Sequence, residues 1–218
     1  MRQLIHVPMW HSKDVQQKQN RPLLRGGMGH ELSKAPPRGF WTTVDESLTD
    51  IDLHGKRPRV YLEGYTGRRR NVPPYIDTSS LEGLILYNFI SRTGSIIEPT
   101  EDKKALKKVK TNYRLLGRTQ IDSAKRARLL DELNNDIDER DDAIAKKIAA
   151  SLGPEEIGFL FLGFNHDAIS RLPADINVTI LNDRLRELIE ESEPAGMPEG
   201  KRRNETENPI GGSVEGKG

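Results

Sequence analysis

Short apolar runs alternate with segments of helical periodicity along most of the chain. The runs predict strands over residues 1–10, 59–63, 95–98, 157–162 and 177–181. Apolar residues three and four positions apart predict helices over residues 40–54, 81–94, 103–116, 122–152 and 182–191, with a short helix between the last two strands. Strands joined by connections of helical length favour an α/β fold. We expect a mostly parallel sheet, with helices on both faces.

Two segments show neither periodicity. Residues 12–39 are rich in Gln, Arg, Gly and Pro and predict a long loop inserted in the domain. Residues 193–218 contain too little apolar surface to order themselves and predict a flexible tail. The remaining length suits one α/β domain over residues 1–192.

The long helix at 122–152 carries a charged residue on its apolar side. Arg140 lies three residues after Ile137 and four before Ile144, so its guanidinium falls on the face that should be buried. A buried arginine requires a carboxylate or similar partner. Glu98 and Glu101, after the third strand, are the candidates for that partner, and the alternative is that they add carboxylates to the rim of the sheet.

Three residues whose side chains can bind a metal or transfer protons lie at or after the ends of predicted strands. His11 ends the first strand, Glu63 the second, and His166 comes shortly after the run at 157–162. Ligands of open α/β sheets bind outside the carboxyl ends of the strands, so neighbouring strands would bring these three side chains together. Asn165 and Asp167 flank His166 and are expected to orient it, although Asp167 also suits the cap of the helix that follows.

Two imidazoles and one carboxylate match the ligand set of catalytic zinc and manganese sites. A divalent metal held by His11, Glu63 and His166 would generate hydroxide near neutral pH. The alternative is that each histidine ends a strand and bonds a backbone carbonyl. With no cysteine in the chain, thiolate ligands, cysteine nucleophiles and disulfides are excluded.

Charge and hydropathy restrict the partners. Thirty-four basic residues nearly cancel thirty-three acidic ones, which gives no overall reason to expect nucleic acid. No apolar stretch approaches the ~20 residues that a membrane helix needs, and the start of the chain is unlike a secretory signal. We therefore expect a cytoplasmic protein that binds neither nucleic acid nor membrane. Homo-oligomer formation is left open.

Four short motifs resemble those of one superfamily: Gly163-Phe164-Asn165-His166, Arg140-Asp141, Tyr61-Leu62-Glu63 and Pro8-Met9-Trp10-His11. They are similar to the Gly-x-x-His proteins, which group erythromycin esterase-like proteins, ChaN-like haem-binding lipoproteins, the TraB family and the Tiki proteases. Pro8 stands where the first of those motifs has glycine. The resemblance marks His11, Glu63, Arg140 and His166 as site residues. It implies activities that differ between members, from metal-dependent peptidases and histidine-dependent esterases to haem binding.

The leading expectation is a hydrolase of ester or peptide bonds acting on a small molecule or a peptide. His11 and His166 would be metal ligands or general base, Glu63 a ligand or water-activating base, and Arg140 an electrostatic partner or oxyanion stabiliser. One alternative is a protein without turnover that binds haem or another small molecule through His11 or His166. Another is an interaction protein that uses the lysines of residues 103–110 or the tail to bind a partner or nucleic acid, although the near-zero net charge argues against nucleic acid.

Overall fold

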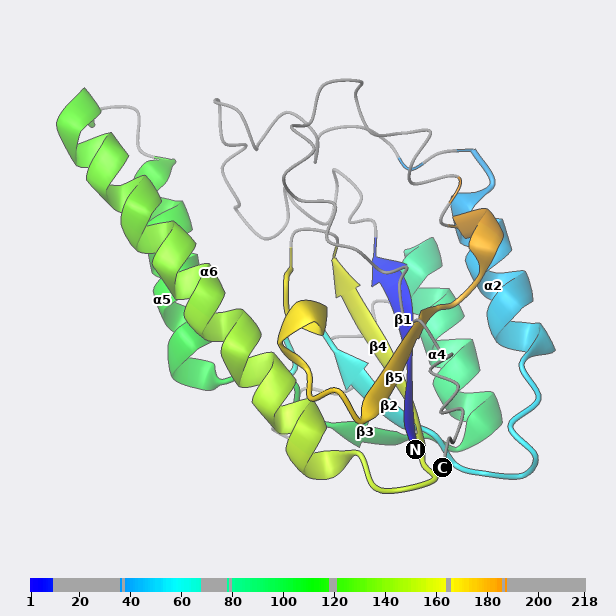
Figure 1. Cartoon of the computed structure of the whole chain (residues 1–218). Coiled ribbons are helices and arrows are strands. Elements are labelled where there is room, and N and C mark those ends of the chain that lie inside the picture. Colours follow the sequence, from blue (N-terminus) through cyan, green and yellow to red (C-terminus); the bar gives the residue numbers. More distant parts are fainter. Residues whose placement is uncertain are drawn as a thin grey trace, which may run out of the picture.

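Five parallel strands form the centre of the computed structural model (Figure 1), which describes residues 1–9, 36, 38–67, 78, 80–117, 121–163, 166–185 and 187. The strand order is β3-β2-β4-β1-β5. In chain order, the strands are β1 (Arg2–Met9), β2 (Arg59–Leu62), β3 (Ile96–Glu98), β4 (Ile157–Gly163) and β5 (Ile176–Ile180). All five predicted strands are present.

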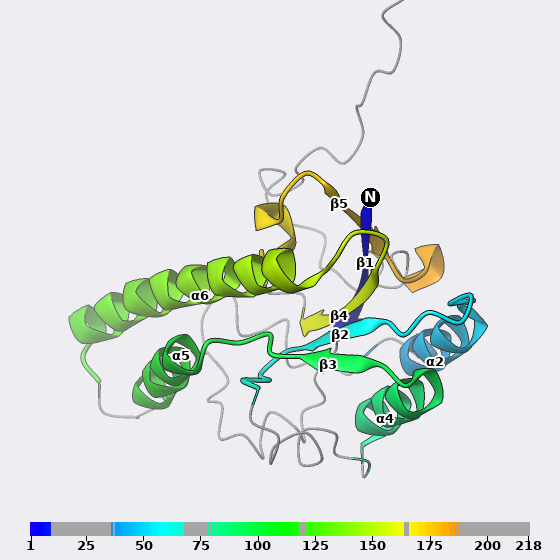
Figure 2. The ribbon, with the colours of Figure 1, turned by 90° about the horizontal axis from the view of Figure 1, so that it is seen from below.

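Helices lie on both faces of the sheet (Figure 2). One face is covered by α2 (Phe40–Asp50) and α4 (Leu81–Thr93). The other face is covered by α6 (Ser123–Ser151), against which α5 (Lys103–Leu116) packs. A short 3-10 helix, η3 (Ile169–Arg171), stands between β4 and β5. The predicted α/β fold, with a parallel sheet and helices on both faces, is confirmed.

The central strand β4 is apolar on both of its faces, as a strand covered on both sides must be. Phe159 and Phe161 point into the core shared with α2 and α4, where both rings contact Phe89. Leu160 and Leu162 point into the core shared with α6. β4 therefore joins two hydrophobic layers, and this position fixes where its carboxyl end meets the neighbouring strands.

Side chains and one glycine set the helix boundaries. The Asp102 carboxylate accepts the first free backbone N–H groups of α5, and Asp122 does the same for α6. Ser80 caps α4 at its start, and Gly94 ends it in the left-handed conformation at φ 59°. The predicted bounds of α5 agree with the structure, and those of α6 differ by one residue at each end.

Other predictions fall partly or wholly outside the described residues. This applies to His11, to Asn165, to most of the loop at 12–39 and to the tail at 193–218. Of the helix predicted at 182–191, residues 183–185 and 187 are described and are helical. Within the described part of the chain, no helix has the length and apolarity that crossing a membrane requires.

Helices α5 and α6 form an arm beside the sheet. Val109 and Leu116 of α5 pack against Leu129 and Leu133 of α6 in a small core of their own. The arm extends beyond the carboxyl ends of the strands, at the upper left of Figure 1. Half-way along α6, the helix reaches the rim of the sheet, and there its residues enter the site.

Candidate functional site

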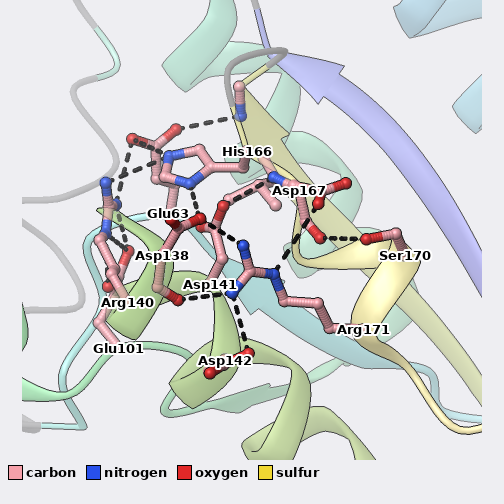
Figure 3. Close-up of polar contacts among 12 residues, drawn as sticks. Glu63, Glu101, Asp138, Arg140, Asp141, Asp142, His166, Asp167, Ser170 and Arg171 are labelled. Atoms are coloured by element: carbon pink, nitrogen blue, oxygen red, sulfur yellow. Dashed lines mark hydrogen bonds and ion pairs between the residues drawn. The ribbon is translucent and has the colours of Figure 1, made fainter. Parts of the chain in front are cut away.

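Glu63 and His166 face one another at the carboxyl rim of the sheet (Figure 3). β2 and β4 are neighbours, so the residues that follow them lie side by side. Glu63 Oε1 is 3.5 Å from His166 Nε2, and Glu63 Oε2 accepts the backbone N–H of Gly163 at 3.1 Å. The two side chains are 9% and 7% exposed. The structure thus brings together two of the three residues predicted at strand ends, and His11 lies outside the described residues.

Arg140 reaches the same point from α6. Its Nε donates to Glu101 Oε2 at 2.8 Å, its Nη2 to Glu63 Oε1 at 3.3 Å, and its Nη1 lies 3.1 Å from His166 Nε2. Both Arg140 and Glu101 are buried, and the Glu101 carboxylate also accepts the backbone N–H of Gly64. Of the two glutamates proposed as partners of Arg140, Glu101 takes that place. The other, Glu98, pairs with Arg59.

Asp141 orients the histidine from its other side. Asp141 Oδ1 is 2.5 Å from His166 Nδ1, and Oδ2 accepts the backbone N–H of Asp167 at 2.7 Å. The carboxylate is 1% exposed, so it fixes both the ring and the segment that carries it. The orienting group was expected beside His166, at Asn165 or Asp167. The side chain that bonds Nδ1 is instead that of Asp141, whereas the Asp167 side chain is 70% exposed.

Arg171 of η3 holds the segment after β4 against α6. Its Nη1 donates to the Asp138 carbonyl at 2.8 Å and to Asp142 Oδ1 at 2.9 Å, and its Nη2 donates to Asp138 Oδ1 at 2.5 Å (Figure 3). Asp138 and Asp142 lie on either side of Asp141 in the sequence, so Arg171 fastens η3 to the stretch of α6 that carries Asp141. No sequence signal marked Arg171.

A second imidazole, that of the half-buried His6, comes from β1. Its Nε2–H donates to the Leu162 carbonyl at 3.2 Å, next to the end of β4. Burial lowers the pKa of His6 to about 4, against the smaller effect of that hydrogen bond, and the nearby His166 lowers the pKa further. His6 is therefore neutral at pH 7. His6 lies within the strand predicted over residues 1–10, and strand periodicity does not show which polar side chain is covered.

His166 takes the opposite charge state. Burial alone would lower its pKa, but the hydrogen bond to Asp141 and the proximity of Glu63 outweigh burial and raise the pKa to about 9. A charged ring donates from Nδ1 to Asp141 and from Nε2 towards Glu63. A neutral ring would instead accept from Arg140 Nη1, but it would leave three buried carboxylates with one cation. We favour the charged ring because buried charge must be compensated.

No protein-family model, no curated protein and no solved structure shows significant similarity to the chain. The resemblance to the Gly-x-x-His superfamily therefore rests on its short motifs alone. Function has to be argued from the geometry of the site.

The described residues do not suit a divalent metal as they are arranged. Arg140 stands against both the Nε2 of His166 and the Oε1 of Glu63, the atoms that would bind the ion. Across the described residues, no group of three His, Cys, Asp or Glu is placed to hold a metal. A zinc or manganese site with His11 as third ligand stays a prediction, as does haem binding, and we derive no step through either.

The two imidazoles predict how stability depends on pH. The raised pKa of His166 stabilises the fold fully below pH 6.5, and this contribution, on the order of 3 kcal/mol, is lost as pH rises through about 9. The lowered pKa of His6 acts in the opposite direction. Its neutral ring costs stability as pH falls from 6.5 towards 4, because the unfolded chain binds that proton first. We expect the free energy of unfolding to be greatest near pH 6.5.

Urea unfolding of the wild type and three variants between pH 4 and pH 10 measures this dependence. His166→Gln should flatten the curve above pH 6.5, and His6→Gln should flatten it below. His54→Gln is the matched control, because the His54 side chain is 79% exposed. A His166→Gln curve that falls as steeply as the wild type between pH 6.5 and 9 would contradict the charge assigned to His166.

Proposed function

We propose that the chain is a hydrolase of ester or peptide bonds, with its site at the carboxyl ends of β2 and β4. The observation that carries this proposal is the pairing of Glu63 and His166 at 3.5 Å, with Asp141 behind the imidazole and Arg140 beside both. A carboxylate and a charged imidazole provide a proton acceptor and a proton donor in one place. This is the combination that hydrolysis requires.

Each side chain then has a defined part in the reaction. Glu63 takes a proton from water as the water oxygen bonds to the carbonyl carbon. Arg140 stabilises the negative charge that develops on the carbonyl oxygen. His166 gives its Nε2 proton to the leaving oxygen or nitrogen as the bond to carbon breaks, and Asp141 holds the ring in the orientation for that transfer.

The resemblance to the Gly-x-x-His superfamily supports the same reading. Glu63, Arg140 and His166 are residues that the motifs mark, and they converge at one rim. β1 is the other neighbour of β4, and His11, two residues beyond the last residue of β1 in the sequence, is the fourth residue that the motifs mark. The proposed substrate is a small molecule or a peptide that carries an ester or amide bond.

A panel of ester and peptide substrates tests the proposal on the purified full chain, with its metal content measured. We expect the wild type to turn over at least one class, His166→Ala to lose that activity, and the control His54→Ala to keep it. Activity that is equal in the wild type and His166→Ala would end the proposal, and so would turnover of no substrate. Titration with haem tests the rival, because an absorbance band that vanishes in His166→Ala would indicate a binding protein.

A further inference from the structure

The near-neutral charge of the chain conceals a strongly basic segment. Between Lys103 and Arg128 there are ten lysines and arginines and one acidic residue, Asp122, whereas the whole chain has a formal net charge of +1. This segment includes α5 and the first turns of α6. The rest of the chain is therefore acidic on balance, and the basic charge is concentrated on the arm.

Four of these cations form a row along α5, which we call the basic row: Lys103, Lys107, Lys110 and Arg114. Spacings of four, three and four residues place them within about 60° of one another on a helix, over roughly 16 Å. All four are exposed, opposite the side of α5 that packs on α6. The basic row is thus a straight, solvent-facing line of positive charge.

The acidic residues of α6 meet a different side of α5. Lys108, turned roughly 130° from the middle of the basic row by helix geometry, lies 2.8 Å from Glu139 and 3.7 Å from Asp136. In the described part of the chain, the ion pairs include none made by Lys103, Lys107 or Arg114. The carboxylates of α6 thus pair with Lys108 rather than with these three members of the row.

More basic residues continue the surface at the far end of the arm. Lys125 and Arg128 lie in the first two turns of α6, next to the end of α5, and both are exposed. Arg128 pairs with Glu132 through a helix-surface contact at 3.0 Å, the kind of ion pair that contributes little and yields readily. Exposed cations therefore lie along α5 and also at the start of α6.

We propose that the basic row binds the phosphodiester backbone of a nucleic acid. A line of lysines and arginines gains affinity by releasing the counterions of phosphate groups, and it needs no apolar contact to do so. From the helix rise, successive residues of the row are about 4.5 to 6 Å apart along the helix axis. This regular spacing suits a repeated anionic backbone. Binding of this kind is independent of sequence and falls steeply with salt.

An anionic membrane and an acidic protein fit the arm less well as partners. A helix that lies on a membrane inserts an apolar face, and protein interfaces centre on apolar or aromatic anchors. The apolar residues of the arm are buried between its two helices. Across the described residues, the exposed large hydrophobic side chains are all away from the arm, at Met1, Leu81, Leu84, Tyr87 and Ile96.

This proposal differs from the expectation drawn from overall charge, and it stands independently of the hydrolase proposal. The test is a titration of the full chain into fluorescein-labelled duplex DNA, duplex RNA and single strands of mixed sequence, at salt concentrations from 50 to 200 mM. The row variant Lys103→Gln/Lys107→Gln/Arg114→Gln should bind at least tenfold more weakly at 50 mM salt. The slope of the log of the binding constant against the log of the salt concentration should become shallower by roughly 2.7 if three phosphate contacts are lost.

The matched control removes the same charge elsewhere, at three exposed positions: Arg38→Gln/Lys56→Gln/Lys146→Gln. It should bind like the wild type, and circular dichroism checks that both variants are folded. Equal losses in the two variants would overturn the proposal, because they would show an effect of net charge alone. Absence of wild-type binding at 50 mM salt would overturn it as well, as would binding confined to anionic lipid vesicles or to an acidic peptide.

Discussion

Arg140→Ala is expected to lower the free energy of unfolding by about 3–5 kcal/mol. The Arg140 side chain is 5% exposed and compensates Glu101, which is 0% exposed, and Glu63. Its removal leaves two carboxylates buried next to Asp141, so the folded state carries uncompensated charge at a site that is largely removed from solvent. Urea unfolding at pH 7, followed by far-ultraviolet circular dichroism, measures the loss.

Three further variants separate the buried charge from other effects. Arg140→Lys keeps the charge but not the planar fork that bonds Glu101, so we expect an intermediate loss. Arg140→Met combined with Glu101→Leu removes both partners and should recover much of the stability. The control Arg128→Ala breaks the surface ion pair with Glu132, in which the Arg128 side chain is 82% exposed, and should cost less than about 1 kcal/mol. If Arg140→Ala costs no more than that control, the buried network does not stabilise the fold.

Asp141→Asn is expected to reduce the turnover of any substrate found by about 100-fold to 10,000-fold. The substitution keeps the shape of the side chain but removes the negative charge at Nδ1 of His166, so the pKa of the ring falls from about 9 towards its ordinary value. The proton donor is then largely neutral at pH 7, and its orientation is less well defined. The measurement is kcat as a function of pH.

The shape of the pH profile distinguishes this role from a loss of structure. Wild-type activity should decline as pH rises through about 9, whereas the small residual activity of Asp141→Asn should decline at lower pH. Asp142→Asn is the matched control, because Asp142 neighbours Asp141 but is 51% exposed and binds Arg171. We expect this variant to keep the wild-type profile. An alkaline limb unmoved by Asp141→Asn would show that Asp141 does not set the proton affinity of the ring.

Features fixed by local sequence could be predicted well. The apolar periodicity and the capping aspartates define α5 and α6 without reference to the rest of the chain. The position of Arg140 in the apolar stripe was enough to predict that it is buried and needs a carboxylate. Glu63 and His166 could be placed at a common rim because parallel strands present their carboxyl ends on one edge.

Features that depend on how distant elements pack could not be predicted. Asp141 faces His166 because of the way α6 packs on the sheet. The apolar periodicity of α6 alone does not predict that packing. His6 is half-buried because distant elements pack on the face of β1 that also carries Leu4, which the alternation of β1 alone does not reveal. The basic row escaped the charge argument because a total over all residues averages a positive arm with an acidic remainder.

The pairing of β1 has a consequence for how the protein is made. Every partner of β1 belongs to β4 or β5, which lie after Glu156 in the chain. During translation the first strand therefore leaves the ribosome long before any residue with which it can bond. Its backbone N–H and C=O groups stay unpaired and its apolar side chains stay uncovered while the arm, whose contacts are local, forms early. Newly synthesised chains should depend on chaperones that shield β1 until the central strands arrive.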